Sequence, residues 1–103
     1  MFLIVNNNDK LELMKVIMLY RPNSEHARGV ESFLRDLLRQ HNVTERDIRQ
    51  INVDTREGIS LCSIYDIMTY PSIVVTTDEG GFIKSWEGTV PLMDELMSYA
   101  YTP

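Results

Sequence analysis

The segment VIMLYRPNSEHARGVESFLRDLL, residues 16–38, carries the clearest folding pattern in the chain. Together with the preceding lysine, its first residues form the run KVIMLY, which is apolar without alternation and is typical of a strand covered on both faces. Arg21-Pro22-Asn23 ends that run. The apolar residues that follow fall on one helical stripe: Val30, Phe33, Leu34, Leu37 and Leu38. We predict a buried strand, a turn and an amphipathic helix with Asn23 or Ser24 as its N-cap.

The next segment repeats the order of strand and helix. RQINV, residues 49–53, predicts a second strand, and a helix between two strands implies a right-handed parallel crossover. Residues 57–68 predict a second helix that packs on the sheet. Its apolar face consists of Leu61, Cys62, Tyr65 and Met68. The helix must end before Pro71, because the residue that precedes a proline is disfavoured in the helical conformation.

The last third of the chain predicts a hairpin and a final helix. SIVVTTDEGGFIKSW, residues 72–86, predicts a hairpin, and Asp78 to Gly81 are its turn residues. Thr89 is the expected N-cap of a helix that has Pro91 in its first turn. The predicted order is therefore strand, helix, strand, helix, strand, strand, helix, which places the chain in the α/β class.

Composition limits the classes of partner and site. The 103 residues suit a single domain, 1–103, and a net charge of −5 disfavours both nucleic acid and anionic membranes as partners. The one cysteine, Cys62, cannot form an internal disulfide, which favours a reducing, cytoplasmic location. One thiol and two histidines without ligand spacing predict no metal site, and no motif indicates a cofactor.

The first fourteen residues have the weakest pattern. MFLIV is a short apolar run without a preceding basic region, so we expect neither a signal peptide nor a membrane span there. Residues 2–5 form either a short edge strand or part of an N-terminal extension. The connection to Lys15 is short for a parallel crossover, and Met14 is an alternative start.

The order of elements and the residues at their joints resemble the thioredoxin family over residues 14–101. The matching features are KVIMLY leading into a helix at Ser24, INVD ending at Asp54, YDI before TYPSIVV, the hairpin glycines, and WEG before the last helix. The resemblance implies a thioredoxin-like three-layer sandwich, in which helices flank a central mixed four-stranded sheet in the order βαβαββα. It also implies that the Tyr70–Pro71 peptide bond is cis.

The sequence departs from the family at its chemical centre. Thioredoxin-like oxidoreductases carry CxxC at the start of the first long helix, where the helix N-terminus stabilises a thiolate and a second thiol resolves the mixed disulfide. Ser24 and Ala27 occupy those two places. The family's buried acid aligns with Met18 and its buried lysine with Gln50. We therefore expect a redox-inactive relative with no catalytic residues at this position.

Other chemistry at these residues is disfavoured. Ser24 and His26 suggest a nucleophile and a base, but residues two apart on a helix do not face each other, and a helix cap with an exposed histidine is the simpler interpretation. Cys62 is either a reactive thiol or a small buried hydrophobe, and its helical position favours burial. Arg21 and Arg28 at the helix N-terminus are candidates for binding an anion, against the simpler interpretation of solvated side chains.

Two functions follow from the resemblance. The first is a non-catalytic module that binds an extended peptide or a protein partner by strand addition, in a groove beside Pro71. The candidate lining residues are Tyr20, Pro22, Ser24, His26, Tyr70, Pro71 and Trp86. The second is a thiol-disulfide or glutathione-linked oxidoreductase that acts through Cys62 or a partner's thiol. A homo-oligomer is a further alternative.

Overall fold

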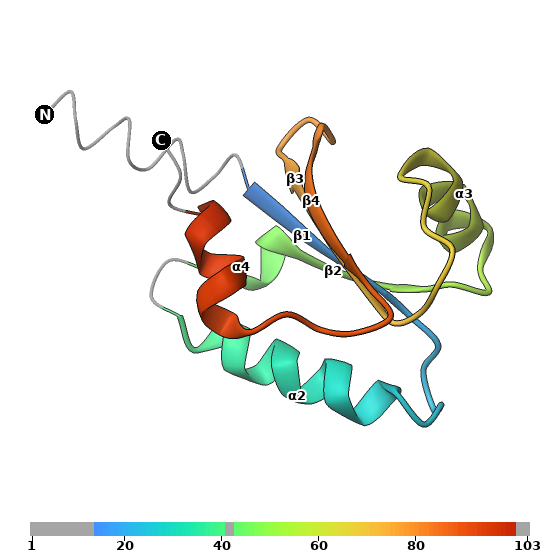
Figure 1. Ribbon diagram of the computed structural model, residues 1–103, viewed down its shortest axis with the longest axis horizontal. Coiled ribbons are helices and arrows are strands. Elements are labelled where there is room, and N and C mark those ends of the chain that lie inside the picture. The colour runs from blue at the N-terminus through green and yellow to red at the C-terminus, as the bar shows by residue number, and fades with distance from the viewer. Residues whose placement is uncertain (1–13, 41–42, 101–103) are drawn as a thin grey trace, which may run out of the picture.

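Strand β1 (Met14–Tyr20) is an inner strand of a mixed four-stranded sheet in the computed structural model of the protein, which describes residues 14–40 and 43–100 (Figure 1). The strand order is β2-β1-β3-β4. Strand β2 (Ile48–Asn52) runs parallel to β1, whereas β3 (Ser72–Thr77) is antiparallel to both β1 and β4 (Phe82–Glu87). The edge strand considered for residues 2–5 lies outside the described residues.

Among residues 14–40 and 43–100, three helices cover the two faces of this sheet. Helices α2 (Ala27–Leu38) and α4 (Met93–Ala100) pack on one face, and α3 (Arg56–Ile64) packs on the other (Figure 1). A short 3-10 helix, η1 (Glu45–Asp47), leads into β2. The predicted α/β three-layer architecture is thus confirmed. Over residues 14–40 and 43–100, no helix has the length and apolar character needed to cross a bilayer.

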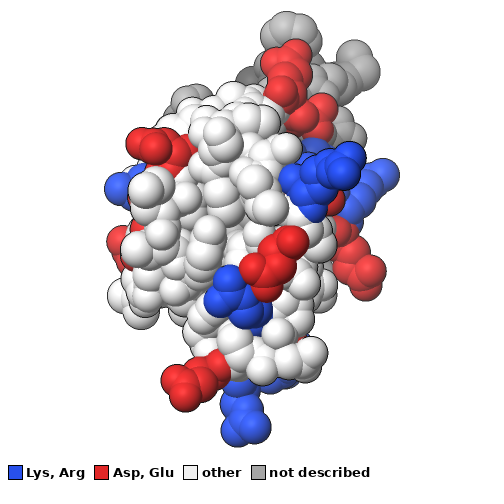
Figure 2. All heavy atoms as spheres, turned by 90° about the vertical axis from the view of Figure 1, so that its right-hand side faces the viewer, with Lys and Arg blue, Asp and Glu red and all other residues white. Residues whose placement is uncertain are grey.

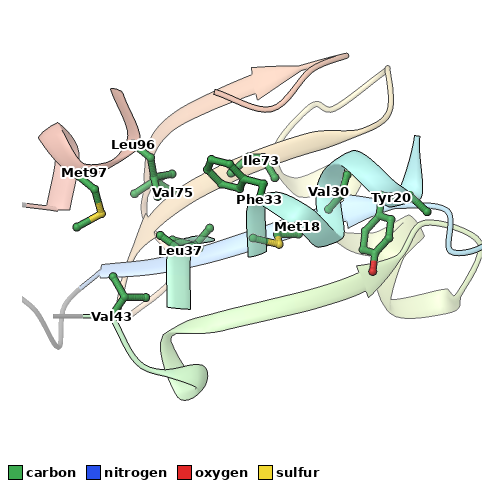
Figure 3. Packing of buried hydrophobic residues seen from close by; sticks show 12 residues of the cluster. Met18, Tyr20, Val30, Phe33, Leu37, Val43, Ile73, Val75, Leu96 and Met97 are labelled. Atoms are coloured by element: carbon green, nitrogen blue, oxygen red, sulfur yellow. The ribbon is translucent and has the colours of Figure 1, made fainter. Parts of the chain in front are cut away.

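The larger core lies between the sheet and helices α2 and α4 (Figure 3). Leu37, which the helical stripe predicted to be buried, is fully enclosed there, as is Leu96 of α4. The sheet contributes Met18 and Val75 to the same cluster. Successive side chains of β1 point to opposite faces of the sheet, and both faces are covered. Met18 packs in the larger core, whereas Ile17 packs in the second core, under α3. The run therefore has no alternation between apolar and polar residues.

Helix α3 is shorter than the predicted helix at residues 57–68. It ends at Ile64, and Asp66 adopts a left-handed conformation with φ 57°, which closes the helix as a C-terminal cap does. Met68, which the helical pattern assigned to the packed face, therefore lies beyond the helix and is 78% exposed. Cys62 is 8% exposed in the core under α3, so its predicted burial is confirmed.

The last elements follow the prediction with one shift. The hairpin forms with its turn between Thr77 and Phe82, and Gly80 takes the positive φ of 94° that the turn requires. The final helix begins at Met93 and not at Thr89. Its first turn is closed by Glu95, whose carboxylate accepts a hydrogen bond from the Leu92 N–H at 3.4 Å. An acidic residue in the first turn thus replaces the expected threonine cap.

Candidate functional site

The loop between β1 and α2, residues 21–26, is organised by its own hydrogen bonds. The Arg21 N–H donates to Nε2 of His26 at 3.0 Å, and the Ser24 hydroxyl donates to the Arg21 carbonyl oxygen at 2.5 Å. Asn23 is in the left-handed region with φ 66°. The helix begins at Ala27, so the prediction that Asn23 or Ser24 is its N-cap is wrong. The Ser24 hydroxyl is engaged with the loop carbonyl and does not reach the helix amides.

The Arg21 side chain connects this loop with two other segments. Its Nε donates to Oδ2 of Asp54 at 2.8 Å and its Nη2 donates to Oδ1 at 2.9 Å, which is a bidentate ion pair. The same guanidinium lies 6.0 Å from the ring centroid of Tyr70. The hydrogen bond from Arg21 lowers the pKa of the Asp54 carboxyl, and that carboxylate raises the pKa of Arg21. Arg21 therefore does not present a free cation to an external anion.

The segment before β3 carries main-chain groups that have no hydrogen-bond partner in the part of the chain that the structure describes. The Tyr70–Pro71 peptide bond is cis, as the resemblance implies. The Thr69 carbonyl accepts from the Ser72 hydroxyl at 2.6 Å, and the Pro71 carbonyl accepts from the Gly88 N–H at 2.7 Å. Between them, the N–H and the carbonyl of Tyr70 have no hydrogen-bond partner within the described part of the chain. Tyr70 is 37% exposed, so these groups belong to a solvent-facing residue.

Cys62 lies next to the Tyr70 side chain. The electrostatic influence of the Cys62 sulfur is the main reason why the pKa of the Tyr70 phenol is raised, followed by burial. Sequence reasoning placed Cys62 on the buried face of its helix but did not place it beside Tyr70. The angle at which α3 crosses the sheet decides that contact, and no local sequence pattern reports such an angle.

Exposed apolar side chains lie in the segments beside Tyr70. Met68 comes two residues before it, and Ile59, which is 62% exposed, lies one helical turn before Cys62. The end of the molecule to which α3 and the β1–α2 loop project has a broad uncharged area (Figure 2). We use the name Tyr70 surface for Tyr70, for Arg21, whose guanidinium lies over the Tyr70 ring, and for the exposed side chains of Met68 and Ile59.

Two residues that the sequence suggested as lining of the groove, Tyr20 and Trp86, make contacts within the fold. Tyr20 is buried; its hydroxyl donates to Glu31 at 3.3 Å and accepts from Gln50 at 3.1 Å, and its pKa is raised chiefly by burial. Trp86 packs edge-on against Tyr99 of α4, with ring centroids 5.7 Å apart. The Tyr20 side chain is therefore enclosed in the core, and the partly buried Trp86 side chain packs against α4.

The remaining candidates stay near the loop. Ser24 and His26 both bond to Arg21 and not to each other, so they do not form a nucleophile and base pair. Pro22 is half-buried beside them, and Arg28 is exposed on the first turn of α2. No group of three or more His, Cys, Asp and Glu side chains suited to a metal ion occurs in residues 14–40 and 43–100.

Two hollows occur on other parts of the surface. One, of about 180 Å3, lies beside α3 and is lined by Ile17, Leu61 and Tyr65 with Lys15 and Arg49 at its rim. The other, of about 380 Å3, lies between α2 and the edge strand β2. Both are open and shallow, and neither includes a residue of the Tyr70 surface.

Comparison with solved structures identifies the fold. A mutant thioredoxin from Halobacterium salinarum NRC-1 superposes with a TM-score of 0.69 at 22% sequence identity, over 87% of this chain and 77% of that one. The oxidised thioredoxin from Plasmodium falciparum gives a TM-score of 0.64 at 13% identity, over 93% and 91% of the two chains. Thioredoxin from Fasciola hepatica gives 0.63 at 16% identity, over 95% and 88%.

The chain therefore has the thioredoxin fold, with its single cysteine at Cys62 and without the paired cysteines of a CxxC redox site. No protein-family model matches the sequence, and no curated protein matches it. At identities of 13–22% the structural likeness establishes the fold alone. The function has to be argued from the site itself.

Proposed function

We propose that this protein is a non-catalytic thioredoxin-fold module that binds an extended segment of a protein partner at the Tyr70 surface. One observation carries the proposal: Tyr70 is exposed, and its N–H and carbonyl have no hydrogen-bond partner among residues 14–40 and 43–100. An extended peptide that lies alongside Tyr70 satisfies both groups by strand addition. The exposed side chains of Ile59 and Met68 supply apolar contacts on the α3 side.

The polar chemistry of the loop supports binding over catalysis. A thiol catalyst at a helix start needs a nucleophile and free N–H groups around it. Here the two positions hold Ser24 and Ala27, and the Arg21 N–H is bonded to His26. The Ser24 hydroxyl is likewise engaged, with the Arg21 carbonyl. The Arg21 N–H and the Ser24 hydroxyl are thus engaged within the loop, whereas the main-chain groups of Tyr70 have no partner among residues 14–40 and 43–100.

The experiment selects ligands from a phage-displayed library of random peptides and then measures one selected peptide by NMR and by titration calorimetry. We expect the Tyr70 amide to become protected from hydrogen exchange when the peptide is bound, because its N–H gains an acceptor. The substitution Tyr70→Ala, which removes the aromatic ring, should weaken peptide binding about tenfold or more, because residues at the centre of an interface contribute most of the binding energy. Phe82→Ala, which removes another exposed aromatic ring on β4, is the matched control and should bind normally.

The proposal fails if the selected peptides bind Tyr70→Ala as tightly as the wild type and leave the Tyr70 amide unprotected. A library that yields no ligand for the folded protein also contradicts it. Loss of binding in both Tyr70→Ala and Phe82→Ala would indicate a general loss of structure, and the NMR spectra of the free variants separate that case from a local effect.

The proximity of Cys62 to Tyr70 favours one alternative, a thiol-disulfide or glutathione-linked oxidoreductase that acts through this thiol. Its low exposure argues against direct attack on a substrate. Turbidimetric reduction of insulin by dithiothreitol tests it. We expect the protein to add nothing to the rate with dithiothreitol alone. A faster rate that disappears in Cys62→Ser would establish the oxidoreductase instead.

A further inference from the structure

His26, the last residue before α2, closes the loop that carries Arg21. Its Nε2 accepts from the Arg21 N–H at 3.0 Å, and the ring packs edge-on against Tyr20 with centroids 6.4 Å apart at 62°. Since the Arg21 carbonyl accepts from Ser24, both main-chain groups of Arg21 are held from within the loop. The contact requires the Nδ1–H tautomer of the imidazole, because only a nitrogen with a lone pair accepts a hydrogen bond.

Arg21 in turn connects this loop to the Tyr70 surface. Its guanidinium binds both carboxylate oxygens of Asp54 and lies over the Tyr70 ring at 6.0 Å. The main chain of Arg21 and its side chain are therefore each fixed, the first by His26 and Ser24 and the second by Asp54. Arg21 is thus in contact with His26 through its main chain and with Tyr70 through its side chain.

We infer that His26 is a pH-sensitive positioning residue, whose neutral imidazole holds Arg21 against Tyr70 and whose protonation releases it. This inference rests on the proposed function, because it concerns the regulation of the same surface. Both ring nitrogens of an imidazolium are hydrogen-bond donors. After protonation, the Nε2–H of His26 would face the Arg21 N–H, and two donors cannot form a hydrogen bond. The loop must then rearrange, and the Tyr70 surface loses the order that Arg21 provides. Binding of an extended peptide is accordingly stronger at higher pH.

Other ionisable groups near the loop do not account for such a change. The pKa of Asp54, which follows β2, is lowered by Arg21, so this carboxylate stays charged at neutral and mildly acidic pH. The pKa values of Tyr20 on β1 and Tyr70 before β3 are raised, so both phenols stay neutral there. Glu31 on α2 reaches the Tyr20 hydroxyl, and Glu31→Gln serves as its control.

The experiment records NMR spectra and peptide affinity between about pH 5 and pH 8, the range in which histidines titrate. The probe is a peptide selected from the random phage-displayed library. Four variants accompany the wild type, and Glu31→Gln is one of them. His26→Gln keeps an acceptor that does not titrate, His26→Ala has no acceptor, and His41→Gln changes the other histidine of the chain.

We expect the Arg21 amide and the Tyr70 ring signals of the wild type to shift with the same midpoint as the His26 ring. Peptide binding should weaken about fivefold at the acidic end, the effect of one lost hydrogen bond. His26→Gln should bind equally at both ends of the range, and His26→Ala should bind at pH 8 as weakly as the acidified wild type. His41→Gln and Glu31→Gln should behave like the wild type.

Arg21 and Tyr70 signals that ignore the titration of His26 would overturn the inference, whatever the peptide does. Signals that follow His26 while the affinity stays constant would overturn the link to binding and leave the proposed function intact. If no peptide binds at any pH, the proposed function fails, and the shared midpoint of the Arg21 and Tyr70 signals still decides whether His26 positions them.

Discussion

Two glycines in helices are expected to respond in opposite ways to the same substitution. Gly58 is buried in the first turn of α3, where a Cβ atom would collide with the main chain at the end of β2. It would overlap the Asn52 carbonyl oxygen and come within 2.8 Å of Val53 Cα. Gly29 in α2 is exposed, and a Cβ there would meet nothing within 4 Å. Both substitutions change helix propensity in the same direction, so a difference between their effects on stability measures the packing contribution at Gly58.

The expected magnitudes follow from these contacts. Overpacking costs about 1–3 kcal/mol, and the upper end applies at Gly58 because the atoms in the way are main chain of a paired strand. Alanine returns about 1 kcal/mol of helix propensity, so Gly58→Ala should lower the free energy of unfolding by about 2 kcal/mol. Gly29→Ala should raise it by about 0.8–1 kcal/mol, since only the propensity term acts.

Urea unfolding followed by circular dichroism measures both changes. With a slope of about 1–1.5 kcal/mol per molar urea for a small domain, the midpoint of Gly58→Ala should fall by roughly 1.5 M and that of Gly29→Ala should rise by about 0.5–1 M. Equal or greater stability of Gly58→Ala would refute the reasoning. It would mean that α3 does not approach the end of β2 as closely as described, and the contact between Cys62 and Tyr70 would then be in doubt as well.

Three further predictions concern the site. Because Arg21 lowers the pKa of Asp54, the ion pair stabilises the fold above the ordinary carboxyl range, and acidification below about pH 4 should destabilise the wild type more than Asp54→Asn in urea unfolding at several pH values. Cys62 should react with a chromogenic disulfide reagent at least about a hundredfold more slowly in the native protein than in urea, because labelling requires local opening of α3. The Ala27 N–H donates to the Ser24 carbonyl at 3.2 Å, so Ser24→Cys with Ala27→Cys spans one turn and should oxidise to a disulfide, which mass spectrometry detects as the loss of two hydrogens.

The sequence predicted the layers of the fold because buried faces require apolar residues at regular spacings. The unbroken apolar run of β1 and the stripe through Leu37 report which faces are covered, and the resemblance supplied the cis bond at Pro71. Helix ends were less predictable. The apolar spacing predicted that the helix at α3 continues to Met68, but the chain turns into the left-handed conformation at Asp66 and the helix ends before it. The aspartate itself is a signal that could have indicated this end, because aspartate tolerates the left-handed conformation.

The arrangement of the site could not be read from the sequence for a different reason. The side chains of Ser24 and His26 can each hydrogen-bond to the N-terminus of a helix or within a loop. The sequence pattern does not indicate which backbone group each side chain binds. The pairing of Arg21 with Asp54 joins residues 33 positions apart, and the contact of Cys62 with Tyr70 depends on the position of α3. Such contacts are decided by tertiary packing.

The hydrogen-bond balance of the loop connects these observations with function. At the start of a helix, unpaired N–H groups favour an anion, and a redox thioredoxin uses that position for a thiolate. In this chain the Arg21 N–H has His26 as its acceptor, the Ser24 hydroxyl has the Arg21 carbonyl, and the Arg21 guanidinium has Asp54. These three donors are therefore engaged within the protein. The open groups lie across from the loop, on the main chain of Tyr70, and an external strand is the partner that fits one N–H and one carbonyl on the same residue.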